Sequence, residues 1–95
     1  MAAYLIVDIE VRDPERYAEY VRVVPETIAR YGGRYLARGG KTETLEGPEE
    51  TRRIVVLEFE NLEAAKAFYH SDDYQAAKRL REGAAEAQFI AVEGV

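Results

Sequence analysis

The sequence predicts a single α+β domain of the ferredoxin-like class, with a four-stranded antiparallel sheet and two helices on one face. Three observations lead to this class. The chain has 95 residues, which gives room for one domain over residues 1–95. Strand-like and helix-like hydrophobic patterns follow one another in the order βαββαβ. Each helical segment is apolar on one side, which faces a sheet, and the βαββαβ order places both helices on the same face of it.

The first predicted strand covers residues 4–11, which are rich in β-branched and aromatic side chains. Asp13 and Pro14 then predict a helix start, because aspartate caps free N–H groups and proline is tolerated at the first helical position. Pro25 lies within the helical pattern and removes one backbone hydrogen bond, so a kink or short break is expected near it. The apolar stripe of this helix consists of Tyr17, Tyr20, Val21, Val24, Ile28 and Tyr31.

The second predicted strand covers residues 34–45 and follows a helix stop at residues 32–33, which are both glycine. Gly39 and Gly40 interrupt this strand, and their missing side chains allow a bulge or a sharp bend. Residues 47–50 have the composition of a turn and separate the second strand from the third.

The third predicted strand covers residues 52–60 and is apolar on both faces, as expected of a central strand. Asn61 is the predicted cap of the second helix. This helix is expected to break at residues 70–73, where Ser71 or Asp72 would cap it again.

Gly83 is expected to end the second helix, and residues 88–93 form the closing strand. The first, third and fourth strands carry apolar residues on both faces, although the helices cover only one. A monomer would therefore expose an apolar sheet to water. The pattern predicts a homodimer in which two sheets pack face to face and enclose a barrel-like core.

The composition is that of an ordinary soluble globular protein, with 47% hydrophobic and 33% charged residues. Eighteen acidic and thirteen basic residues give a net charge of −5, and the basic residues are scattered, which argues against nucleic-acid binding. The absence of cysteine excludes disulfides and thiol chemistry and fits a reducing compartment. No targeting or membrane segment is apparent, so we expect a cytoplasmic protein without a membrane partner.

A series of short motifs runs along nearly the whole chain. They are Asp13-Pro14-Glu15 with Tyr17 and Tyr20, residues 28–40, Leu45-Glu46-Gly47, Val55-Val56-Leu57-Glu58-Phe59, Leu62-Glu63-Ala64-Ala65, Ser71-Asp72-Asp73-Tyr74-Gln75 and Val92-Glu93-Gly94-Val95. This pattern resembles the DUF1330 family of the dimeric α/β-barrel superfamily. The resemblance implies a ferredoxin-like fold and dimerisation. It implies no activity, because the family is named for its unknown function.

Arg38 is a candidate ligand-binding residue, because it lies within a predicted strand of a covered sheet. A buried guanidinium needs a carboxylate or an anionic ligand. Asp8 and Glu58, inside the first and third strands, are candidate partners. Strand alternation does not decide whether the three side chains share a face, because a bulge at the nearby glycines can shift the register. A buried ion pair at the dimer interface, a site for a carboxylate-bearing small molecule and simple exposure all stay open.

His70 is the only histidine and lies at the predicted helix break. Its imidazole could act as an acid or a base, or the residue could simply lie at the surface or cap a helix. Together with Arg38 and Glu58 it is a candidate catalytic residue. With one histidine and no ligand-like spacing of the acids, neither a metal nor another cofactor is predicted. The tyrosines that could line a cleft between helix and sheet, rather than only pack the core, are Tyr35, Tyr69 and Tyr74.

Three functions are compatible with these features. The first is a homodimer that binds a small apolar or carboxylated molecule in a helix–sheet pocket. The candidate ligand-binding residues are Arg38, Asp8, Tyr35, Tyr69 and Tyr74. The second is a cofactor-free monooxygenase-like or isomerase-like enzyme, which resemblance at the superfamily level suggests. The third is an assembly module without a ligand, which would require a completely filled helix–sheet interface.

Overall fold

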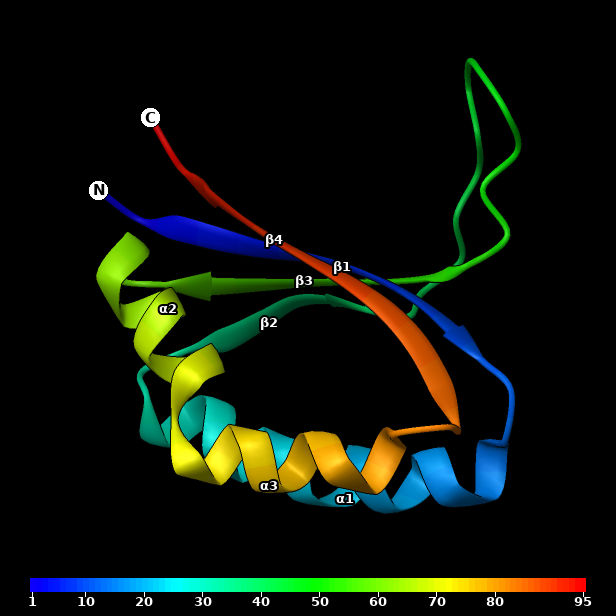
Figure 1. Cartoon of the computed structure of the whole chain (residues 1–95). Helices are drawn as coiled ribbons and strands as arrows, with labels where there is room; N and C mark the ends of the chain where they lie inside the picture. Colours follow the sequence, from blue (N-terminus) through cyan, green and yellow to red (C-terminus); the bar gives the residue numbers. More distant parts are fainter.

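The four strands form one antiparallel sheet in the order β2-β3-β1-β4, which confirms the predicted ferredoxin-like class (Figure 1). The computed structural model describes residues 1–95. The elements are β1 (Ala3–Val11), α1 (Pro14–Arg30), β2 (Arg34–Arg38), β3 (Arg53–Phe59), α2 (Leu62–His70), α3 (Asp72–Arg81) and β4 (Ala85–Glu93). Figure 1 shows α1 and α3 side by side beneath the sheet, with α2 at one end of it. None of the helices is long and apolar enough to cross a membrane.

The structure has three helices, where two were predicted. Ser71 separates the second from the third, because its extended backbone, with a ψ of 153°, ends α2. Its side chain then accepts a hydrogen bond from the Tyr74 backbone N–H and caps α3. The predicted break and second cap are therefore confirmed. They divide the segment into two helices of different direction instead of interrupting one.

The first helix is capped as predicted but is not broken. The Asp13 side chain accepts a hydrogen bond from the Arg16 backbone N–H at 3.3 Å, and Pro14 occupies the first turn. The helix continues through Pro25 to Arg30 as one element, so the short break considered for this position is absent.

The second strand is shorter than predicted, because β2 ends at Arg38 and residues 39–52 form a loop that projects beyond the sheet (Figure 1). Gly39 has a φ of 69°, a conformation that favours glycine, and this turns the chain out of the sheet. A Cβ atom at Gly39 would lie only 2.1 Å from the Arg53 guanidinium. The glycine therefore makes room for Arg53 beside the end of β2.

The pairing of β2 with β3 is irregular, as expected, but at a different place. The register shifts between Tyr35 and Ala37 and not at the later glycine pair. Beyond the shift, Arg38 lies opposite Val55 on β3. At the other sheet edge, β4 begins at Ala85, before predicted residue 88, because its pairing extends to the end of β1.

The two faces of the sheet differ in character. Along β1, residues Ala3, Leu5, Val7 and Ile9 are buried against the helices. The alternate residues point to the opposite face, which no helix covers (Figure 1). We call this surface the open face; it is formed by Tyr4, Ile6, Asp8, Ile54, Val56, Glu58, Ile90 and Val92.

Aromatic rings fill much of the layer between sheet and helices. Phe59, Phe68 and Tyr74 are fully buried. The ring centroids of Phe68 and Tyr74 are 4.8 Å apart, and those of Phe59 and Phe68 are 5.3 Å apart. These contacts join α2 and α3 to β3 and leave a gap nearer to α1.

Candidate functional site

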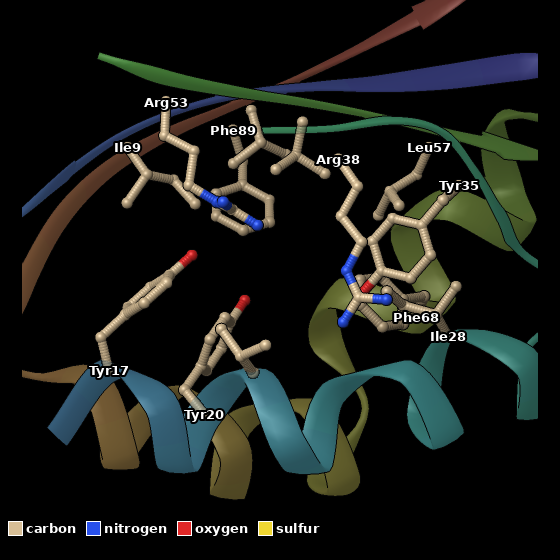
Figure 2. Close-up of a pocket in the computed structure, with 13 residues that line it drawn as sticks. Ile9, Tyr17, Tyr20, Ile28, Tyr35, Arg38, Arg53, Leu57, Phe68 and Phe89 are labelled. Atoms are coloured by element: carbon tan, nitrogen blue, oxygen red, sulfur yellow. The ribbon is translucent and has the colours of Figure 1, made fainter. Parts of the chain in front are cut away.

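A cavity lies between the sheet and α1, and we call it the α1 cavity (Figure 2). Its empty volume is about 410 Å³ including the open mouth, of which about 30 Å³ is accessible to the centre of a water molecule. The cavity is therefore a narrow slot. Its walls are mainly apolar, and its polar lining residues are Tyr17, Tyr20, Tyr35, Arg38 and Arg53.

Two arginines enter the cavity without an acidic partner. Arg38 reaches in from β2 and Arg53 from β3 (Figure 2). Neither forms an ion pair with a carboxylate, and no acidic side chain lines the cavity. The Arg38 guanidinium lies 4.5 Å from the centroid of the Tyr35 ring. The Nε atom of Arg53 is buried without a hydrogen-bond partner. The cavity thus concentrates positive charge in a chain whose net charge is −5.

Three tyrosines supply hydroxyl groups to the same space. Tyr17 and Tyr20 rise from α1 with their hydroxyl oxygens towards the sheet (Figure 2). Burial raises the pKa of Tyr17, and Arg53 opposes this effect. Burial, followed by the neighbouring Tyr74, raises the pKa of Tyr20 well above its usual range. Burial also raises the pKa of Tyr35, against the influence of Arg38. All three hydroxyls therefore keep their protons at neutral pH and can donate hydrogen bonds.

We expect the buried Tyr20 to make the protein less stable as the pH rises above about 10. The ordinary pKa of tyrosine is 10.0, so the unfolded chain ionises there while folded Tyr20 keeps its proton. The stability that Tyr20 contributes is complete below pH 10 and falls by up to about 1.4 kcal/mol per pH unit above it. In urea denaturation between pH 8 and 11, the free energy of unfolding should fall less steeply with pH for Tyr20→Phe than for the parent protein. Equal slopes for parent and variant would contradict the assignment.

Asp8 and Glu58 do not meet Arg38. Both acids lie on the open face, whereas Arg38 lines the cavity on the helix side. Asp8 Oδ1 is 3.7 Å from Arg52 Nε, and Glu58 Oε1 is 2.5 Å from Arg34 Nε. An ion pair between Arg38 and these acids, which is one of the alternatives that the sequence leaves open, is therefore not formed within the chain. The physical reason is the register shift in β2, which decides on which face Arg38 lies.

The other candidate residues are also distributed over different places. Tyr74 is fully buried, and its hydroxyl shares hydrogen bonds with Tyr20 at 2.9 Å and Arg81 at 3.1 Å, so it belongs to the core. Tyr69 and His70 line a different cavity on the other side of the core. The candidate catalytic residues therefore do not converge. Of the candidate ligand-binding residues, Arg38 and Tyr35 line the α1 cavity.

Tyr17 and Tyr20 were expected only in the apolar stripe of the first helix, and the charged residue of this site that sequence reasoning missed is Arg53. Arg53 belongs to the same alternating series of β3 residues as Val55, Leu57 and Phe59, which are all buried on the helix side. This alternation was a usable signal, since every second residue of a strand lies on the same face. Arg53 is the first residue of this series, so it lies at the edge of the core.

A comparison with protein-family models matches residues 2–95 to the domain of unknown function DUF1330. No match was found among curated proteins. Among solved structures, a protein of unknown function from Rhodopseudomonas palustris is 20% identical, with a TM-score of 0.78 over 99% of this chain and 82% of that one. A dimeric ferredoxin-like protein of unknown function from Jannaschia sp. CCS1 is 15% identical, with a TM-score of 0.71 over 99% and 100% of the two chains.

The cofactor-independent oxygenase SnoaB from Streptomyces nogalater is also similar in fold, at 8% identity and a TM-score of 0.70 over 99% of this chain and 93% of that one. At these identities the likeness concerns the fold alone. The family match, in contrast, covers nearly every residue. The chain belongs to the DUF1330 family.

Proposed function

We propose that the protein binds a small organic anion with an apolar body, such as an aromatic carboxylate, in the α1 cavity. The observation that carries this proposal is the convergence of Arg38 and Arg53, both without an acidic partner, on one apolar slot. Guanidinium groups bind carboxylates through two parallel, charge-assisted hydrogen bonds. A ligand carboxylate would also relieve the cost of leaving buried Arg53 Nε unpaired.

The remaining lining fits the same chemistry. The protonated hydroxyls of Tyr17, Tyr20 and Tyr35 are donors, which suits an anion, and the apolar walls suit a hydrocarbon body. The slot is narrow, so a planar ring fits better than a bulky group. Cofactor and metal play no part in this proposal.

The two alternatives have less support. An assembly module would need a filled helix–sheet interface, whereas the α1 cavity leaves this interface incompletely filled. An enzyme of the cofactor-free monooxygenase or isomerase type would need an acid or base beside the ligand. Glu58 lies on the open face and His70 lines another cavity, so neither is beside Arg38. Binding is therefore the function that the geometry supports best.

We further propose that the protein works as a homodimer joined through the open face. This face presents Ile90 and Val92 with 49% and 47% of their surface exposed, next to the half-buried Ile6 and Val56. Burying such a patch is favourable. Similar structures, including the one from Jannaschia sp. CCS1, are described as dimeric, which supports the same assembly here. A cytoplasmic location and the lack of a nucleic-acid partner stay predictions.

Arg38→Gln is expected to weaken the binding of benzoate by at least about tenfold, because a charge-assisted hydrogen bond contributes roughly 1.5–3 kcal/mol. Titration calorimetry with benzoate measures this change, and native mass spectrometry of gently purified protein shows whether an endogenous acid is present.

Arg34→Gln is the matched control. It removes the same charge from the same strand, but Arg34 pairs with Glu58 instead of lining the cavity. Its affinity for benzoate should equal that of the parent. Equal losses in both variants, or no loss in Arg38→Gln, would overturn the proposal.

A further inference from the structure

A second cavity lies on the other side of the core, between β4 and the helices α2 and α3, and we call it the α2–α3 cavity. Its empty volume is about 790 Å³ including the open mouth, and about 350 Å³ is accessible to the centre of a water molecule. It is thus much roomier than the α1 cavity. Small side chains create this space, since Ala87 and Ala91 on β4 contribute only methyl groups beneath it.

The charged residues that line this cavity are all basic or potentially basic: Lys66, His70, Lys78 and Arg81. No acidic side chain lines it. In a chain with five more acidic than basic residues, a one-sided lining of this kind requires an explanation. Charge of one sign within a partly enclosed cleft attracts ligands of the opposite sign.

The partners of these cations do not neutralise them. Lys78 Nζ donates to the Tyr69 hydroxyl at 3.0 Å, and Arg81 Nη2 donates to the Tyr74 hydroxyl at 3.1 Å, so both partners are neutral. Arg81 is only 6% exposed, and its Nε atom is buried without a hydrogen-bond partner. A cation buried in this way is costly unless an anion accompanies it.

Lys66, the other lysine that lines this cavity, has only one acidic partner, which is distant and exposed. Its Nζ atom is 3.8 Å from Glu63 Oε1, and the side chain of Glu63 is 82% exposed. An exposed pair of this kind is worth little, so Lys66 is free to turn towards a ligand.

We propose that the α2–α3 cavity is a second binding site, for an organic anion with a flat bicyclic or similarly large apolar body. Lys78 and Arg81 hold the acidic group, and Lys66 adds charge at the rim. The apolar body lies on Ala87 and Ala91. A bare inorganic ion would leave most of the space unfilled, because a water molecule occupies only about 30 Å³.

This site is distinct from the one proposed above. Phe89 is the only residue that lines both cavities. Arg38 and Arg53 line the α1 cavity only, whereas Lys78 and Arg81 line the α2–α3 cavity only. The two proposals can therefore fail independently.

The test uses 1-naphthoate as the probe, followed by NMR of the alanine methyl groups in the intact protein. We expect the Ala87 and Ala91 signals to shift on titration, and Lys78→Gln to weaken this binding by about tenfold, the loss expected for one charge-assisted hydrogen bond. Arg79→Gln is the matched control, because Arg79 lies next to Lys78 on α3 but does not line the cavity. Lys78 is half-buried at the cavity rim, so its replacement leaves the core intact.

Two further measurements distinguish this site from the α1 cavity and a carboxylate ligand from a phosphate ester. Arg38→Gln should leave the Ala91 shift unchanged, which distinguishes failure at this site from failure at the α1 cavity. A parallel titration with 1-naphthyl phosphate decides whether a carboxylate or a phosphate ester is preferred. No shift at Ala87 and Ala91 at millimolar 1-naphthoate, or equal affinity in Lys78→Gln and the parent, would overturn the second site.

Discussion

Tyr74→Ala is expected to lower the free energy of unfolding by about 3–5 kcal/mol, the usual cost of removing a large buried ring. Tyr74 is fully buried, and its ring centroid lies 4.8 Å from that of Phe68 and 5.9 Å from that of Phe89. Its removal would open a cavity where α2, α3 and β4 meet. Urea denaturation followed by circular dichroism measures the loss.

The milder Tyr74→Phe isolates the hydroxyl group. It should cost about 1–3 kcal/mol, because the hydroxyl of Tyr20 and the guanidinium of Arg81 lose a buried partner. Tyr31→Phe is the control, since the Tyr31 ring packs against the core without a hydrogen bond from its side chain. Tyr74→Phe with the stability of the parent would show that Tyr74 does not join Tyr20 to Arg81.

Ile6→Glu is expected to convert the proposed dimer into a monomer, weakening association by at least about 30-fold, as truncation of a central interface residue does. Ile6 lies on the central strand β1, with Val56 and Ile90 directly opposite on the neighbouring strands. A glutamate there would place two like charges near each other in an apolar interface. Sedimentation equilibrium over a range of protein concentrations measures the dissociation constant.

Val23→Glu is the matched control for Ile6→Glu. Val23 lies on α1, away from the open face, and 44% of its surface is exposed. The same charge introduced there should leave the dissociation constant unchanged. A parent protein that is monomeric at high concentration, or a dimeric Ile6→Glu variant, would refute assembly through the open face.

Most of the fold follows from local patterns in the sequence. Apolar alternation and capping side chains at Asp13, Asn61 and Ser71 locate helix starts, and the structure has these caps. The length of β2 does not follow from such patterns. It ends where Gly39 approaches the Arg53 guanidinium, a contact with a residue on another strand. Local preference cannot report a contact of that kind.

The candidate site was predicted only in part, for a related reason. Arg38 is a candidate because it is a charged residue within a strand, and Tyr35 is a candidate because it is a tyrosine that could line a cleft between helix and sheet. The face on which Arg38 lies depended on a register shift that the sequence does not mark. The sequence therefore leaves open whether Asp8 and Glu58 share a face with Arg38, and the structure places them on the opposite face. Arg53 was overlooked although its alternation with Val55 placed it on the helix side.

The alternation along β1 separates two kinds of evolutionary change. A substitution at Val7 alters the α1 cavity, whereas a substitution at its neighbour Ile6 alters only the open face. If the two proposals hold, substitutions on one side of β1 can change the proposed ligand while the proposed dimer interface stays the same, and substitutions on the other side can do the reverse. Deletion of one residue within β1 would exchange the two sets of side chains and disrupt both at once. Insertions and deletions should therefore be tolerated better in the projecting loop at residues 39–52 than within β1.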